Sequence, residues 1–137
     1  RSQFKRVMVH MLLQTFAVLI VLSGAAMVLI VPLLSFVGEE EYREAVWMLP
    51  WVLLVICIYN LALVPHFGLY ALGSDRAILY ITVGAASVFA LIIVWVLPLG
   101  GVHAALSAIG AGSLVLLIAM TVQLYFAWTR FTRGTPA

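Results

Sequence analysis

Charged residues are scarce in this chain. Seven Lys and Arg and five Asp and Glu make up 9% of the 137 residues, whereas 66% of the residues are hydrophobic. A soluble domain of this size needs far more polar surface to face water. The composition therefore excludes a water-soluble domain and predicts that lipid surrounds most of the chain.

Cysteine is nearly absent as well. Cys57 is the one cysteine, so no intramolecular disulfide can form. The spacing of His103 and of the glutamates at 39–41 and 44 does not predict a metal-binding site. We expect those glutamates to lie in a solvated loop. The sequence has no phosphate-binding glycine loop, no nucleophile with a base in reach and no paired carboxylates inside an apolar segment. We expect no enzyme activity, no metal, no cofactor and no nucleic-acid partner.

The longest uncharged stretch covers residues 77–129, which contain no Asp, Glu, Lys or Arg. The segment from Pro98 to His103 interrupts this stretch near its middle. Each half is long enough to cross a bilayer as a helix, which takes about 20 apolar residues. The pattern predicts a membrane helical hairpin with a tight, uncharged turn.

Two further apolar segments precede this hairpin. The four predicted membrane spans cover residues 7–37, 45–72, 77–97 and 104–128. The predicted fold class is an all-α integral membrane helical bundle with short loops, and residues 1–137 form a single transmembrane region. Because the chain begins with Arg1 rather than Met, we expect a fragment or a processed product. A removed signal peptide is the alternative, but the apolar run continues to Leu34, which suits a span better.

Basic residues mark the predicted orientation. They precede the first span, lie between the second and third spans, and follow the fourth span: Arg1, Lys5, Arg6, Arg76, Arg130 and Arg133. With four crossings, these three places lie on one side of the membrane. Arg43 alone lies on the other side, beside glutamates. The positive-inside rule then places both termini in the cytoplasm.

Small residues recur within the spans and predict close helix–helix contacts. The fourth span has one at every fourth position, namely Ala104, Ala108 and Gly112. The third span has a small face, and the first span has a small patch near mid-depth; these consist of residues 84–87 and 24–26.

Pro65 is the main backbone feature of the second span. Its ring removes the hydrogen bond to the Leu61 carbonyl, so a kink is expected there, with Asn60 and His66 near enough to satisfy the freed groups. Bent helices recur in transporters as bending points, which makes Pro65 the predicted hinge. The alternative is a proline that the membrane helix merely tolerates.

A few polar side chains within the spans are candidates for function. Asn60, near the middle of the second span, and Gln14, in the first span, are candidates for a substrate cavity. For Asn60 the favoured alternative is a hydrogen bond between helices or with groups freed at Pro65. Interfacial hydrogen bonding explains Gln14, and Gln123 in the fourth span, at least as well as a substrate contact. His66 is a candidate for proton coupling, and an interfacial histidine is the alternative.

Three segments, taken together, resemble polysaccharide and O-antigen flippases. Residues 36–45 (FVGEEEYREA) resemble the loop that enters a span in that family, and residues 70–76 (YALGSDR) resemble its inner turn. Residues 96–106 (VLPLGGVHAAL) resemble its outer turn. That turn departs from the family pattern, because Gly100 and Gly101 come early and His103-Ala104 stand where a second glycine is usual.

The family belongs to the multidrug/oligosaccharidyl-lipid/polysaccharide superfamily, and the three segments extend over most of the chain. The resemblance implies that this chain is the C-terminal part of a larger two-lobe transporter in the cell inner membrane. It further implies three kinds of partner: membrane lipid, a lipid-linked saccharide as substrate, and the remaining N-terminal helices of the same protein.

The spans carry no charge at mid-depth, so the residues that bind the substrate phosphate would lie mostly outside this chain. This chain would then supply packing, cavity wall and a hinge. Two alternatives stay open. One is a standalone four-helix structural or assembly subunit, and the other is a drug or ion antiporter of the same superfamily.

Overall fold

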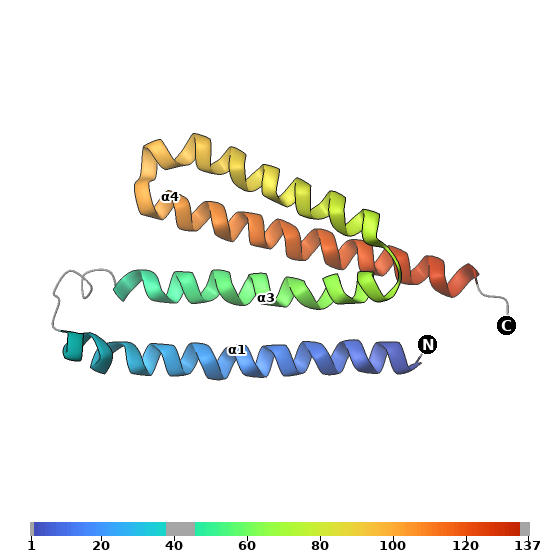
Figure 1. Ribbon diagram of the computed structural model, residues 1–137, viewed down its shortest axis with the longest axis horizontal. Coiled ribbons are helices and arrows are strands. Elements are labelled where there is room, and N and C mark those ends of the chain that lie inside the picture. The colour runs from blue at the N-terminus through green and yellow to red at the C-terminus, as the bar shows by residue number, and fades with distance from the viewer. Residues whose placement is uncertain (1, 38–45, 135–137) are drawn as a thin grey trace. The chain divides into compact units, whose positions relative to one another are not determined.

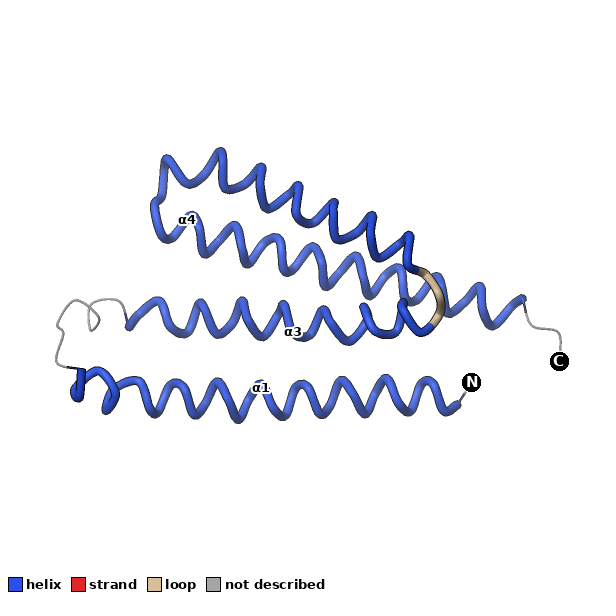
Figure 2. Tube along the Cα trace, viewed as in Figure 1, coloured by secondary structure: helices blue, strands red, loops and turns tan. Residues whose placement is uncertain are grey.

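The computed structural model describes residues 2–37 and 46–134. Helix α1 spans Ser2–Val37, the short 3-10 helix η1 spans Val46–Met48, α3 spans Leu49–Ala71 and α4 spans Asp75–Gly134 (Figure 1). Every regular element in these two ranges is a helix, which confirms the all-α prediction (Figure 2). The glutamate-rich segment, residues 38–45, lies outside the described residues.

Four helical segments are long and apolar enough to cross a membrane. They are Gln3–Phe36, Val46–Ala71, Asp75–Val96 and Gly100–Thr132. The chain is therefore a multi-pass membrane protein, as predicted. The first and last helices extend beyond the predicted spans because flanking residues such as Lys5, Arg6 and Arg130 also favour helix, although they do not favour lipid.

The chain divides into two compact units, Arg1–Cys57 and Ile58–Ala137, with the boundary inside α3. The first unit holds α1, η1 and the beginning of α3. Ser23 Oγ and Cys57 Sγ lie 3.5 Å apart in this unit and link α1 to α3 through a weak hydrogen bond. The small patch at residues 24–26 gives no close contact at Gly24, because a Cβ there would meet no atom within 4 Å.

The second unit begins with the later part of α3 and turns sharply into α4. Gly73 adopts a φ of 66°. The Ser74 N–H donates to the Leu69 carbonyl and the Gly73 N–H donates to the Tyr70 carbonyl, both at 3.0 Å. This is the hydrogen-bond pattern of a Schellman C-cap. The Ser74 carbonyl then accepts the first hydrogen bonds of α4 from Ala77 and Ile78, so one short turn both ends α3 and starts α4.

Helix α4 is a hairpin of two arms rather than one straight helix. The break falls at Gly101, whose φ of 53° and ψ of −130° are non-helical. The predicted interruption from Pro98 to His103 is therefore wider than the observed one, because Pro98 is accommodated inside the helix. In Figure 1 the chain reverses direction at this point.

The two arms of α4 pack through small residues. Ala104 and Ala108 are 4% and 0% exposed, and Gly112 is buried as well. A Cβ at Gly112 would lie 3.3 Å from Phe89 Cβ on the first arm and 3.9 Å from the Ala85 carbonyl oxygen. The predicted small-residue contact of the fourth span is thus present. Of the predicted small face at 84–87, only Ala85 is buried.

Candidate functional site

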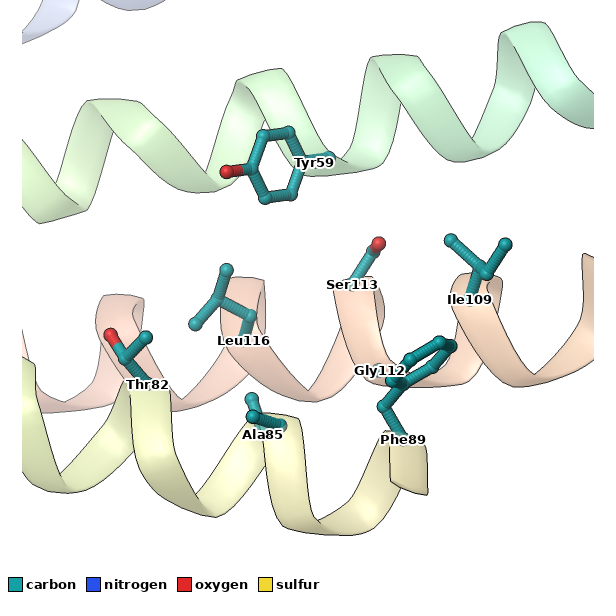
Figure 3. A pocket seen from close by; sticks show the side chains of 9 residues that line it. Tyr59, Thr82, Ala85, Phe89, Ile109, Gly112, Ser113 and Leu116 are labelled. Atoms are coloured by element: carbon teal, nitrogen blue, oxygen red, sulfur yellow. The ribbon is translucent and has the colours of Figure 1, made fainter. Parts of the chain in front are cut away.

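An open groove forms where three helical segments of the second unit meet. Tyr59 contributes from α3, one set of residues from the first arm of α4, and another from its second arm (Figure 3). The groove has a volume of about 270 Å³. Its lining residues are Tyr59, Thr82, Ala85, Ala86, Phe89, Ile109, Gly112, Ser113 and Leu116. We refer to it as the hydroxyl groove, because Tyr59, Thr82 and Ser113 each bring a hydroxyl group to it.

The sequence explains why a hollow forms here. Gly112 and Ala85 allow the two arms to approach closely. Larger side chains beside these small residues, such as Phe89 and Leu116, line the hollow that is left. In Figure 3, Thr82, Ser113 and Leu116 point toward the side on which Tyr59 lies. The accessible surface of the groove is almost wholly apolar, and the three hydroxyl groups contribute little of it.

These three hydroxyl groups differ from six others in the helices. Six Ser and Thr hydroxyls each donate to a carbonyl about one turn earlier in their own helix: Ser35, Ser87, Ser107, Thr121, Thr129 and Thr132. Such bonds satisfy a hydroxyl group inside a membrane. Within the described residues, the hydroxyls of Tyr59, Thr82 and Ser113 have no such bond, so they can donate to another molecule or segment.

Ser113 is the most enclosed of the three. Its side chain is 7% exposed, the only polar one in the buried set of described residues. No side-chain nitrogen or oxygen in the described part is sealed from solvent without a partner, so the Ser113 hydroxyl is reached through the groove. Burial restricts this hydroxyl to partners that enter the groove.

The groove lies in the middle of the membrane-spanning region. At 1.5 Å per residue, Ser113 lies about 18 Å from the Gly101 turn and Tyr59 lies about 21 Å from the Gly73 turn. Since the hydrocarbon core of a bilayer is about 30 Å thick, both side chains are far from the lipid headgroups. Lipid tails offer no hydrogen-bond partner there, so these hydroxyl groups can pair only with a polar group of another molecule or helix.

The polar residues predicted from the sequence do not line this groove. Gln14 is exposed on α1, whereas Asn60 and His66 on α3 and Gln123 on α4 are half-buried. The His66 ring packs edge-on against Phe67, with 5.7 Å between the ring centroids. The roles of Asn60 and Gln14 in a cavity and of His66 in proton coupling stay predictions.

Pro65 lies buried inside α3, together with Ala62, Val64, Gly68 and Leu69. Helix α3 continues through it from Leu49 to Ala71, and the ribbon shows no sharp bend there (Figure 1). Helical geometry is kept on both sides of the ring, so this conformation shows no sharp bend in α3. A hinge role therefore depends on a second conformation in which α3 bends.

Pro65→Ala tests that role. Alanine restores the N–H that can bond to the Leu61 carbonyl and stiffens the helix. If Pro65 is a moving part, we expect transport to fall severalfold while the free energy of unfolding changes by about 1 kcal/mol or less. Pro50→Ala is the matched control, because Pro50 lies in the first turn of α3, where its missing N–H is not needed. Unchanged activity of the full-length Pro65 variant would remove the hinge hypothesis.

In the described ranges, no three His, Cys, Asp or Glu side chains lie close enough together to bind a metal ion. The sequence pattern predicted Ala85, Gly112 and their neighbours as packing residues, but it did not predict that Tyr59, Thr82 and Ser113 line one groove. Hydroxyl residues at mid-span were the available signal. Their meeting depends on helix rotation, which the sequence pattern of an all-apolar helix does not define.

Comparison of the chain with protein-family models, with curated proteins and with solved structures finds no match. The resemblance to flippases therefore rests on the three sequence segments alone. Two of them coincide with the turns at Gly73 and Gly101, and residues 38–45 of the third lie outside the described residues.

Proposed function

We propose that this chain is part of a membrane transporter that moves lipid-linked oligosaccharide or polysaccharide precursors across the cytoplasmic membrane. The observation that carries the proposal is the hydroxyl groove at mid-membrane depth. Polar groups at this depth are costly and are usually kept for function. Transporters commonly bind their substrates near the bilayer midplane.

The choice of substrate class rests on the sequence segments that resemble flippases. A saccharide fits the groove chemically, because hydroxyl groups bond to sugar hydroxyls and the rings of Tyr59 and Phe89 offer apolar faces. The remaining helices of the same protein would complete the cavity and supply the basic groups that hold the phosphate. No residue of this chain acts as a catalyst in this proposal.

Removing the groove hydroxyls one at a time tests the proposal. We expect Ser113→Ala, Thr82→Val and Tyr59→Phe in the full-length protein each to lower glycan export about fivefold. This corresponds to about 1 kcal/mol for one lost hydrogen bond. Export is measured as surface glycan in cells that depend on this protein.

Ser87→Ala and Thr121→Val are the matched controls. Their hydroxyls bond to the carbonyls of Val83 and Leu117 in their own helices, at 2.8 and 2.7 Å. Export should stay within about twofold of the parent in both controls. If the groove variants export normally but lose association with another membrane protein, the chain is an assembly subunit instead.

The proposed orientation places both termini and the Gly73 turn in the cytoplasm, with the Gly101 turn outside. Single cysteines at Asp75 and Val102, introduced in a Cys57→Ser background, report on these two turns. An impermeant thiol reagent added to intact cells should label the second position and not the first. Labelling of both positions from the same side would contradict the four-span topology.

A further inference from the structure

The three hydroxyl groups of the hydroxyl groove are not equally accessible. Ser113 is 7% exposed, whereas Tyr59 is 49% exposed and Thr82 is exposed as well. The rest of the accessible surface of the groove is almost wholly apolar. A ligand group that reaches Ser113 therefore meets a single enclosed hydroxyl group among apolar side chains, and it meets the other two hydroxyls only nearer the opening.

Helix geometry places apolar side chains on both sides of the Ser113 hydroxyl. Ile109 precedes Ser113 by four residues and Leu116 follows it by three, so all three lie on one face of the second arm of α4. Both apolar side chains line the groove, and Figure 3 shows Ser113 between them. A polar group of a ligand that lies here without a partner loses its hydration, which weakens binding about fivefold or more.

One hydroxyl donor between apolar side chains matches the chemistry of an acyl group. The carbonyl oxygen of an acyl group accepts a hydrogen bond from the Ser113 hydroxyl, and its methyl group is buried against Ile109 and Leu116. A sugar hydroxyl at the same place has no apolar part to bury. A plain methyl group, as in a deoxy sugar, would leave the Ser113 hydroxyl without a partner.

We propose that the hydroxyl groove recognises an acyl substituent, such as an acetamido group, on the transported saccharide. Ser113 donates to the acyl carbonyl, while Ile109 and Leu116 contact the methyl group. Tyr59 and Thr82 bond to ring hydroxyls nearer the opening. The inference rests on the proposed function, because it names the kind of saccharide that the same groove binds. At about 270 Å³, the groove is smaller than the roughly 300–1,000 Å³ of pockets for drug-sized ligands, so it takes one acylated ring rather than a whole oligosaccharide.

Titration of two glycosides onto the full-length protein in phosphatidylcholine nanodiscs, followed by native mass spectrometry, tests the inference. Decyl 2-acetamido-2-deoxy-β-glucoside carries the acyl group, and decyl β-glucoside carries a hydroxyl group at the same position. The shared decyl chain makes their partition into the bilayer similar. We expect the parent to bind the acylated glycoside about tenfold more tightly. Ser113→Ala should weaken binding of the acylated glycoside about fivefold and change binding of the other by less than about twofold.

Ala86→Phe fills the groove, because Ala86 lines it and is exposed. This variant should weaken binding of both glycosides about tenfold or more. Ser87→Phe is the matched control, since Ser87 is exposed but does not line the groove, and it should change both affinities by less than about twofold.

The outcomes separate this inference from the proposed function. Equal affinity of the parent for the two glycosides, with both weakened by Ala86→Phe, would overturn recognition of the acyl group and leave the groove as a saccharide site. A preference that survives Ser113→Ala in full would overturn it too. If Ala86→Phe weakens binding of neither glycoside, the groove binds no saccharide, and the proposed function is overturned together with the inference.

Discussion

Gly112→Leu is expected to force the two arms of α4 apart. The first added carbon would already lie 3.3 Å from Phe89 Cβ, which is closer than ordinary van der Waals contact. Phe89 Cβ is attached directly to its backbone, so only a shift of the helix can relieve the overlap. Overpacking of this kind usually costs about 1–3 kcal/mol, and with three further carbons we expect a loss near the upper end.

The measurement is the free energy of unfolding in detergent micelles titrated with SDS, followed by tryptophan fluorescence. Gly84→Leu on the first arm is the matched control, because a Cβ there meets no atom within 4 Å. The control should change stability by less than about 0.5 kcal/mol, as expected for a surface position. Equal stability of the Gly112 variant and the parent would show that the arms do not meet at this position.

Gly101→Ala should destabilise the hairpin by about 1–3 kcal/mol, the usual cost of forcing a side chain into a sparsely populated backbone conformation. The φ of 53° and ψ of −130° at Gly101 belong to a region that only glycine adopts readily. A Cβ at this position meets no atom within 4 Å, so the cost arises from the backbone alone. The same SDS titration measures it.

Straightening of α4 cannot relieve this strain. A continuous helix of 60 residues would be about 90 Å long, roughly three times the thickness of the hydrocarbon core. The variant must therefore keep a turn near this point.

D-alanine at position 101, introduced by semisynthesis, separates backbone conformation from side-chain size. Its preferred angles are the mirror image of those of L-alanine, and the mirror image of the Gly101 conformation is near polyproline II, an unstrained region. D-alanine should leave stability unchanged or slightly raised. A similar loss with both enantiomers would show that the turn does not need a positive φ.

The sequence by itself determined that lipid surrounds the chain and that the chain has four membrane spans. Four apolar runs, separated by polar or glycine-containing segments, define four membrane helices, since a chain in lipid must satisfy its backbone hydrogen bonds within each segment. The spacing of Ala104, Ala108 and Gly112 also identified the packed stripe of the last span. The extent of the interruption near Pro98 was less well predicted, because proline and glycine signal a break without showing which residue forms it.

Only the tertiary structure decided which side chains share a site. Tyr59, Thr82 and Ser113 lie far apart in the chain and meet because α3 and both arms of α4 present particular faces to one another. Likewise, Ala85 is buried while its small neighbours Gly84, Ala86 and Ser87 are exposed. The physical reason is that the sequence of a helix that is apolar on every side does not indicate which side faces its neighbours. Close contacts at positions such as Gly112 fix that rotation, and they form only when the helices pack.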